Sequence, residues 1–145
     1  MTCVEVDMVV SDSRAALALY EKIFETKRIE VTSFGQGFNE AVFSIYGTRF
    51  HLLDENSQYQ LAAPKPGDPK PMWVNVIVPD IKAVFGKALA AGCTETQSIT
   101  EMPGFDVVNA TFSDPFGYSW MLHEHKHKAA FGERNDIFEK DTKLC

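Results

Sequence analysis

The sequence predicts an α+β fold in which two tandem β-α-β-β-β modules form a cupped mixed sheet around a cavity. Two patterns that each occur twice support this prediction. A Phe-Ser pair, a turn glycine and a strand with leucine at the fifth residue past the glycine surround Gly47 and return around Gly117, 70 residues later. A short apolar strand pattern ahead of Asp12 returns ahead of Asp80, 68 residues later. Repeats at a nearly fixed spacing indicate that one structural unit has been used twice.

A chain of 145 residues is long enough for one well-buried domain and too short for two independent ones. We therefore expect the two modules to share one core within a single domain over residues 1–145. The expected parts are module one at about 3–55, a linker at 56–71, module two at about 72–125 and a C-terminal tail at 126–145.

The first module begins with a strand pattern over residues 4–10, where apolar and acidic residues alternate. One set of side chains should face the helices and the other set the cavity; these sets are Val4, Val6, Met8 and Val10, and Glu5, Asp7 and Val9. Ser11, Asp12 and Ser13 can each cap a helix that runs to about Lys27. Strands are expected over 29–34, 40–45 and 49–53.

Residues 54–71 predict a long loop, because four prolines and one glycine oppose any regular element. A loop of this length is unusual in a compact domain, and a joint between two repeated modules explains it.

The second module repeats the first. Its strand over 72–78 has Trp73, Asn75 and Ile77 where the first strand has Glu5, Asp7 and Val9. Asp80 is the expected cap of a helix that stops at Gly92. Three strands should follow, over 94–99, 107–112 and 119–124. The mostly polar tail is either a frayed end or an arm on a neighbouring chain, and together with the long linker it predicts a homodimer.

Composition and charge limit the classes of binding partner and the cellular location that we expect. A net charge of −6 without a Lys/Arg stripe argues against nucleic acid and anionic membrane as partners and favours a small-molecule ligand. The start of the chain lacks the regions of a signal peptide and the apolar runs are short, so we expect a cytoplasmic protein. Cys3, Cys93 and Cys145 have no metal-type spacing and are expected to be reduced thiols.

Three segments resemble a known family: Val-Ser-Asp12 with the helix pattern up to Phe24, Val-Pro-Asp80 with the helix pattern up to Gly92, and Asp114-Pro-Phe-Gly-Tyr-Ser-Trp120. Together they make residues 4–125 similar to the vicinal oxygen chelate superfamily of glyoxalases, bleomycin-resistance proteins and extradiol dioxygenases, and within it to the PhnB-like branch. The resemblance implies a cupped sheet around a cavity. It also implies, for members that use a metal, ligands from the first and last strand of each module.

Carried over by register, the family's metal-binding histidine falls on Glu5 and Trp73, and its glutamate falls on His51 and Met121. An indole cannot coordinate a metal ion, and a thioether suits only soft metals. Asp7 lies two residues along the strand from Glu5, about 6–7 Å at strand rise, which is far for the same ion. We therefore expect no metal and no cofactor at the family's position.

Glu5 and His51 are the candidate catalytic pair, because an imidazole beside a carboxylate in a half-dry cavity can act as a general base. The alternative is a structural hydrogen-bonded pair in a binding pocket. The run His123, His125 and His127 is either a metal-binding tract or a solvated strand end.

An aromatic clamp on a planar or cationic ligand is the candidate binding site. Trp73, Phe43 and Phe112 would form the clamp, and Glu5 and Asp7 would supply negative charge. Core packing is the alternative for the two phenylalanines. The other expected ligand-binding residues are Asn75, Met121 and His123.

The sequence therefore leaves two classes of function, since the fold does not decide between them. The first is a binding protein that holds a small aromatic or cationic molecule between the modules without a tightly bound metal. The second is a lyase, isomerase or dioxygenase that uses Glu5 and His51, with or without a metal. Nucleotide-binding loops and the motifs of serine hydrolases and zincins do not occur in the sequence.

Overall fold

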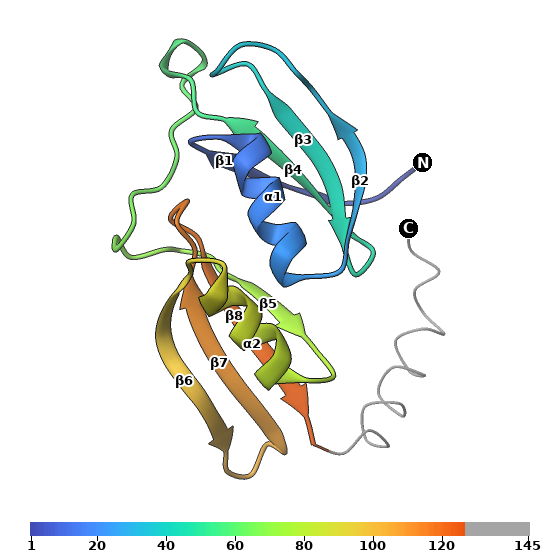
Figure 1. Ribbon diagram of the computed structural model, residues 1–145, viewed down its shortest axis with the longest axis vertical. Helices are drawn as coiled ribbons and strands as arrows, with labels where there is room; N and C mark the ends of the chain where they lie inside the picture. Colours follow the sequence, from blue (N-terminus) through green and yellow to red (C-terminus); the bar gives the residue numbers. More distant parts are fainter. Residues whose placement is uncertain (127–145) are drawn as a thin grey trace.

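Two four-stranded sheets with the same strand order make up the computed structural model, which describes residues 1–126 (Figure 1). The predicted tail therefore lies outside the described residues from 127 onward. The elements in chain order are β1 Glu5–Val10, α1 Ser13–Ile23, β2 Thr26–Val31, β3 Glu40–Ile45, β4 Thr48–Asp54, the short 3₁₀ helix η1 Ser57–Tyr59, β5 Val74–Ile77, α2 Ile81–Ala90, β6 Thr94–Met102, β7 Val107–Ser113 and β8 Ser119–His125.

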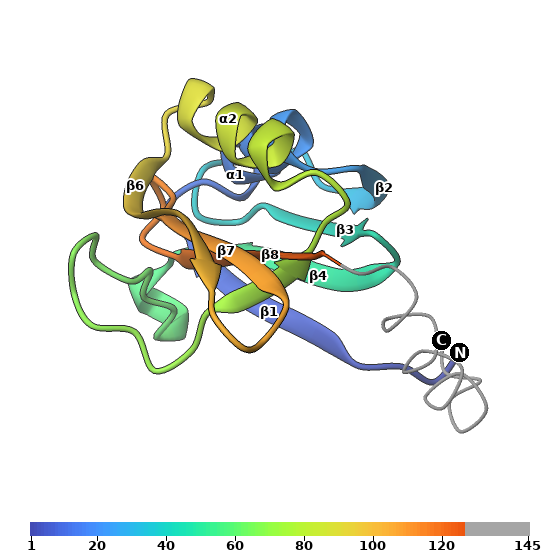
Figure 2. The same cartoon turned by 90° about the horizontal axis from the view of Figure 1, so that it is seen from below.

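The duplication predicted from the sequence is confirmed by the topology. The sheets have the orders β1-β4-β3-β2 and β5-β8-β7-β6. The pairs β1–β4 and β5–β8 are parallel, and the other neighbouring strands pair antiparallel. Helices α1 and α2 cover the same side of the two sheets and pack next to each other (Figure 2). Within residues 1–126, no α-helix covers the opposite faces, which are called the helix-free faces below.

Alternation along the strands separates a buried face from a face turned away from the helices. Leu52 on β4 and Leu122 on β8 are completely buried, whereas their neighbours His51 and Met121 are only half-buried on the other face, as predicted. Met8 and Val10 also lie in the core, but Val4 precedes β1 and is 83% exposed, so its predicted burial is wrong.

The predicted helix caps are present. The side chains of Asp12 and Asp80 accept hydrogen bonds from the backbone N–H groups of Ala15 and Ala83, at 2.9 and 3.0 Å, and so satisfy one unpaired donor in the first turn of each helix. Gly92 adopts a positive φ of 102° just after α2, as a helix-stopping glycine does.

Several boundaries differ from the prediction, among them the ends of β2 at Val31 and of β6 at Met102. Helix α1 ends at Ile23 because Phe24 already has extended backbone, and β2 begins at Thr26 rather than at residue 29. Strand β5 begins at Val74, so Trp73 lies just before it. The linker is not wholly irregular, because Asn56 caps the short η1 helix and forms a bridge with Leu61.

The two modules are joined through the buried carboxylate of Asp114, which comes directly before the turn into β8. Its Oδ2 accepts hydrogen bonds from the Tyr20 hydroxyl of α1 at 2.6 Å and from the Trp120 indole N–H of β8 at 2.9 Å. Its Oδ1 accepts from the backbone N–H groups of Phe116 and Tyr118 at 2.9 and 3.0 Å. Burial, and then the adjacent carboxylate, raise the pKa of Tyr20 well above its usual value, so the phenol keeps the proton that it donates.

Aromatic packing surrounds this joint. The Trp120 ring of module two lies with its centroid 5.1 Å from those of Tyr20 and Phe24 and 6.3 Å from that of Phe50, all in module one. Aromatic pairs at such distances stabilise a core beyond the area that they bury. The modules therefore share one core, and Asp114 accepts hydrogen bonds from the Tyr20 hydroxyl and the Trp120 indole N–H within it.

We predict that Asp114→Asn lowers the free energy of unfolding by about 2–4 kcal/mol, because either orientation of the amide turns an NH₂ group toward buried donors. Urea unfolding followed by far-UV circular dichroism measures the change. Tyr20→Phe is the matched control, since it removes one donor and leaves the carboxylate's other three bonds, and it should cost about 1–1.5 kcal/mol. An Asp114→Asn protein as stable as Tyr20→Phe would contradict this account of the joint.

Candidate functional site

His51 is the centre of a charged cluster on the helix-free face of module one. It lies on β4, between β1 on one side and β3 on the other. The strand register places Asp7 directly opposite His51, and Glu5 opposite Arg49. Because alternate residues of a strand share a face, all four side chains point away from the helices.

Carboxylates lie against both nitrogens of the His51 ring. Nε2 is 3.0 Å from Oε2 of Glu40, which comes from β3. Nδ1 is 3.6 Å from Oε1 of Glu5 and 3.6 Å from Oδ1 of Asp7. Glu5 uses its other oxygen, Oε2, for an ion pair with Arg49 at 2.8 Å. The predicted pair of Glu5 and His51 is thus one part of a larger cluster.

The position of Asp7 corrects the expectation that it is too far from Glu5 to share an ion. The candidate ligand atoms of Glu5, Asp7 and His51 all lie within 4.8 Å of one another. The Cα spacing along the strand overstates the separation, because both carboxylates lean toward the imidazole on the neighbouring strand. Glu40 was missed from the sequence, although the tight turn at Gly47 sets the register of β3 against β4 and would have placed it diagonal to His51.

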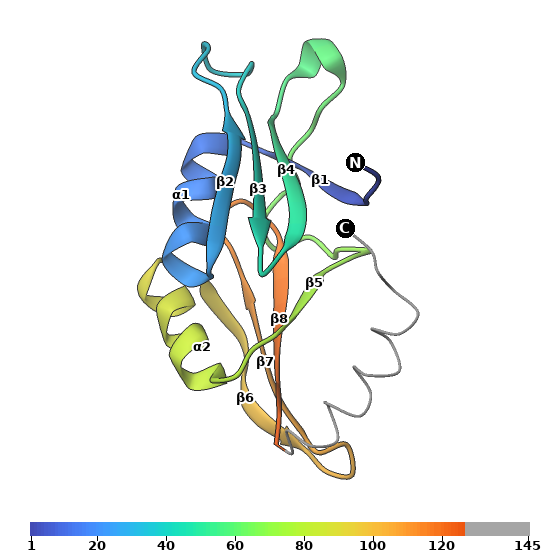
Figure 3. The same ribbon diagram turned by 90° about the vertical axis from the view of Figure 1, so that its right-hand side faces the viewer.

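Trp73 and Asp7 both line a pocket of about 330 Å³ at the junction of the two modules. Its walls come from β1, from the proline-rich linker, from the segment just before β5 and from the start of β8. Trp73 is 56% exposed, and Val6, Met72 and Tyr118 add to a mostly apolar lining. Figure 3 shows the linker running along this side of the molecule from β4 to β5.

Polar contacts beside this pocket join the two modules and close a loop within the linker. The Tyr118 hydroxyl donates a hydrogen bond of 2.9 Å to the carbonyl of Val9 across the module boundary. The ammonium group of Lys70 donates to the carbonyls of Lys65 and Asp68 at 2.7 and 2.6 Å. Lys70 therefore lines the pocket while its charged end is bonded to the linker itself.

Phe43 and Phe112 do not belong to a ligand clamp, and this part of the predicted site is wrong. Both side chains are completely buried in the core on the helix side of their sheets. Phe43 stacks on Tyr20 and Phe50, and Phe112 stacks on Trp120. Phe43 pairs with Phe50, the neighbour of His51 on β4, and Phe112 pairs with Trp120, the neighbour of Met121 on β8. Because successive residues of a strand point to opposite faces, both phenylalanines lie on the face opposite His51 and Met121.

The remaining predicted residues lie on the helix-free face of module two. The side-chain amide nitrogen of Asn75 is 3.1 Å from Nδ1 of His123, and Asn75 pairs in register with Met121. Burial, and then the neighbouring His125, lower the pKa of His123 below its usual value. His127 lies outside the described residues, so the predicted histidine run is described only in part.

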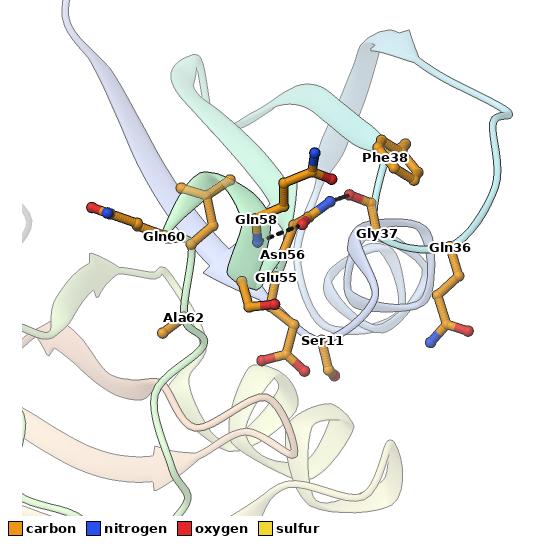
Figure 4. Close-up of a pocket in the computed structure, with 11 residues that line it drawn as sticks. Ser11, Gln36, Gly37, Phe38, Glu55, Asn56, Gln58, Gln60 and Ala62 are labelled. Carbon is orange, nitrogen blue, oxygen red and sulfur yellow. Dashed lines mark hydrogen bonds between the residues drawn. The ribbon is translucent and has the colours of Figure 1, made fainter.

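A larger hollow of about 810 Å³ lies at the far end of module one, between the loop that precedes β3 and the loop around η1 (Figure 4). Its lining contains one ionisable side chain, Glu55. Gln36 and Gln60 point in opposite directions there, and Asn56 is occupied in bonding the two loops together at the carbonyl of Gly37. The aromatic side chain of Phe38 and the carboxylate of Glu55 also line this hollow, and Figure 4 shows them apart from each other.

The sequence profile of the glyoxalase/bleomycin resistance protein/dioxygenase superfamily matches residues 3–122. The chain belongs to this superfamily. No curated protein matches the sequence significantly.

Several solved structures share the fold at low sequence identity. TioX from Micromonospora sp. ML1 superposes with a TM-score of 0.66 at 18% identity, over 86% of this chain and 99% of that one. The PhnB protein from Bacillus cereus gives 0.65 at 18%, over 85% and 99%. FosX from Listeria monocytogenes, a fosfomycin resistance protein solved in complex with Mn(II) and a sulfate ion, gives 0.67 at 12%, over 92% and 97%.

The residues at the superfamily's cross-module metal position do not fit a metal ion. Module one offers Glu5 and His51 there, but module two offers an indole and a thioether, and Trp73 instead forms a wall of the junction pocket. Within residues 1–126, no helix is both long and apolar enough to span a bilayer. The cytoplasmic location stays a prediction.

Gly117 controls the position of the linker over the junction pocket. Its φ is +94°, and a Cβ at this residue would lie 2.5 Å from the carbonyl oxygen of Pro64, which lines the pocket. Gly47 occupies the equivalent turn in module one with a φ of +88°, but its Cβ would meet nothing within 4 Å.

We therefore predict that Gly117→Ala destabilises the protein more than Gly47→Ala. Both substitutions cost about 1–2 kcal/mol of backbone strain, and Gly117→Ala adds about 1–3 kcal/mol because the Pro64 carbonyl must move. Urea unfolding of the two variants measures the difference. Equal losses of stability would mean that the linker does not rest on this turn.

Proposed function

We propose that this protein binds a small molecule with a flat aromatic part and a positive charge in the pocket at the module junction. The observation that supports the proposal most directly is that an exposed indole and a carboxylate, Trp73 and Asp7, line the same pocket. An aromatic face attracts flat rings and cations alike, and a nearby carboxylate adds preference for a positive charge.

The dimensions and lining of the pocket suit such a ligand. About 330 Å³ is at the small end of the range for small-molecule sites, so the ligand has one or two fused rings rather than a large skeleton. The lining is apolar apart from a few groups, which is the usual composition of a site that buries most of its ligand.

The charges around the pocket favour a cation over an anion. Lys70 and Asp7 have opposite charges, but the Lys70 ammonium is already bonded to two linker carbonyls. The Asp7 side chain is 60% exposed, and Glu5 and Glu40 add negative charge beside it. Asp7 is therefore the charged group at this pocket that remains accessible to a ligand.

The geometry gives less support to general-base catalysis by Glu5 and His51. A general base needs a lone pair directed at the substrate. Here Glu40 occupies Nε2 of His51, and Nδ1 faces two carboxylates of the protein.

The homodimer predicted from the linker and the tail stays a prediction.

We predict that N-methylquinolinium, a permanent flat cation, quenches the fluorescence of Trp73 when it binds. The second tryptophan, Trp120, is 1% exposed and serves as an internal reference that stays unquenched. Trp73→Ala should weaken binding about 3- to 30-fold, as expected for the loss of one cation–π contact. Isothermal titration calorimetry measures this loss, since the variant lacks the fluorescent reporter.

Two further arms test the role of charge. Asp7→Asn should weaken binding of N-methylquinolinium, whereas Glu95→Gln, which removes a negative charge from exposed β6, should not. Quinoline, neutral at pH 8, and 2-naphthoate, an anion of similar size, should bind more weakly than the cation. Tighter binding of 2-naphthoate would contradict the proposal and assign recognition to Lys70.

A further inference from the structure

One wall of the hollow at the far end of module one is a segment that is longer than its counterpart in module two. Residues 32–39 connect β2 to β3, whereas the shorter segment 103–106 connects β6 to β7. Both modules form a sheet with the same strand order, so the fold does not require the longer connection. Loops on a rigid scaffold often carry binding residues. The extra length is therefore better explained by the hollow than by the fold.

The two loops that form the hollow are fixed against each other and against β4. A carboxylate oxygen of Asp54, at the end of β4, accepts a hydrogen bond of 3.0 Å from the backbone N–H of Gly37. The side-chain amide of Asn56 donates to the carbonyl of the same glycine at 2.8 Å. The rings of Phe38 and Tyr59 lie edge to face with centroids 6.5 Å apart. These contacts form the hollow without help from a ligand.

Neutral amides make up much of the polar lining. Gln36, Gln58 and Gln60 line the hollow and are exposed, and within residues 1–126 their side-chain amides bond to no other group of the chain. Each amide offers two donors and one acceptor oxygen, and a hydroxyl also both donates and accepts. A ligand with many hydroxyl groups can therefore bond to these amides in several orientations.

The other lining groups favour a neutral ligand with an apolar side. Phe38 is 55% exposed and offers a ring face, which suits the C–H side of a sugar ring. Among the described lining residues Glu55 is the one ionisable group, and its carboxylate repels anions but accepts hydrogen bonds from hydroxyls.

The size of the hollow suits a ligand of more than one ring. Figure 4 shows Phe38 apart from Glu55, and Gln36 and Gln60 pointing in opposite directions, so one small ring cannot reach all of these groups. The volume of about 810 Å³ is toward the upper end of the range for small-molecule sites.

We propose that this hollow binds a short neutral oligosaccharide, with hydroxyls bonded to the glutamine amides and one ring face on Phe38. A peptide fits less well, because its backbone groups alternate along a line and pair best with a strand edge. The site is separate from the pocket of the proposed function, and the two share one lining residue, Ala62.

The test is nuclear magnetic resonance of the full ¹⁵N-labelled chain with maltotriose, cellotriose, xylotriose and the trimer of N-acetylglucosamine. At least one of these sugars should bind and shift the side-chain amide signals of Gln36, Gln58 and Gln60. Phe38→Ala should weaken this binding about 3- to 10-fold through lost apolar contact. Gln58→Leu should weaken it about 2- to 10-fold through lost hydrogen bonds.

Two control variants locate the binding. Phe105 is 75% exposed on the corresponding loop of module two and does not line the hollow, so Phe105→Ala should leave sugar affinity unchanged. Trp73→Ala should also leave it unchanged, and N-methylquinolinium should not displace the sugar. A failure at the hollow is thus distinguishable from a failure at the junction pocket.

The proposal is overturned if none of the four trisaccharides binds, or if Phe38→Ala binds sugar as tightly as the wild type does. Equal weakening by Phe105→Ala and Phe38→Ala would also overturn it. A last arm uses the neutral peptide N-acetyl-triglycine amide, which should not bind. If this peptide shifts the three glutamine signals and the sugars do not, the hollow is a peptide site instead.

Discussion

The architecture depends on one buried carboxylate. Asp114 accepts four hydrogen bonds, and the donors come from both modules and from its own turn. A buried ion without these partners would cost several kcal/mol, so the turn, helix α1 and the indole of Trp120 are held in one relative arrangement. The same turn places Tyr118 against β1 and Gly117 against the linker. Tyr118, β1 and the linker all form walls of the junction pocket. The constraint that joins the modules thereby also shapes the candidate site.

Local patterns in the sequence predicted most of the fold, because caps, turn glycines and strand alternation act over a few residues. Asp12, Asp80 and Gly92 work as expected, and Leu52 and Leu122 lie under the helices. The errors have different physical causes. Phe43 and Phe112 were assigned by their aromatic chemistry although their strand register puts them in the core, and Glu40 reaches His51 only through pairing of two strands.

The site shows how one fold can keep its shape while its polar groups change. In module one the helix-free face has Glu5, Asp7, Glu40 and Arg49 around one imidazole, and each of these charged groups has a partner of opposite or complementary character. In module two the equivalent face has an indole, an amide and a thioether. The charged groups of this face therefore lie in module one, and an exposed indole lines the pocket at the module junction.

The most direct test of this account is hydrogen exchange of the two tryptophan indole N–H groups, followed by nuclear magnetic resonance in deuterium oxide. If Asp114 joins the modules into one cooperative core, the Trp120 indole proton exchanges as slowly as the slowest backbone amides of both modules, while the exposed Trp73 proton exchanges at once. Rapid exchange of the Trp120 proton while the amides of module one stay protected would show that module two opens independently, and would contradict the central role of Asp114.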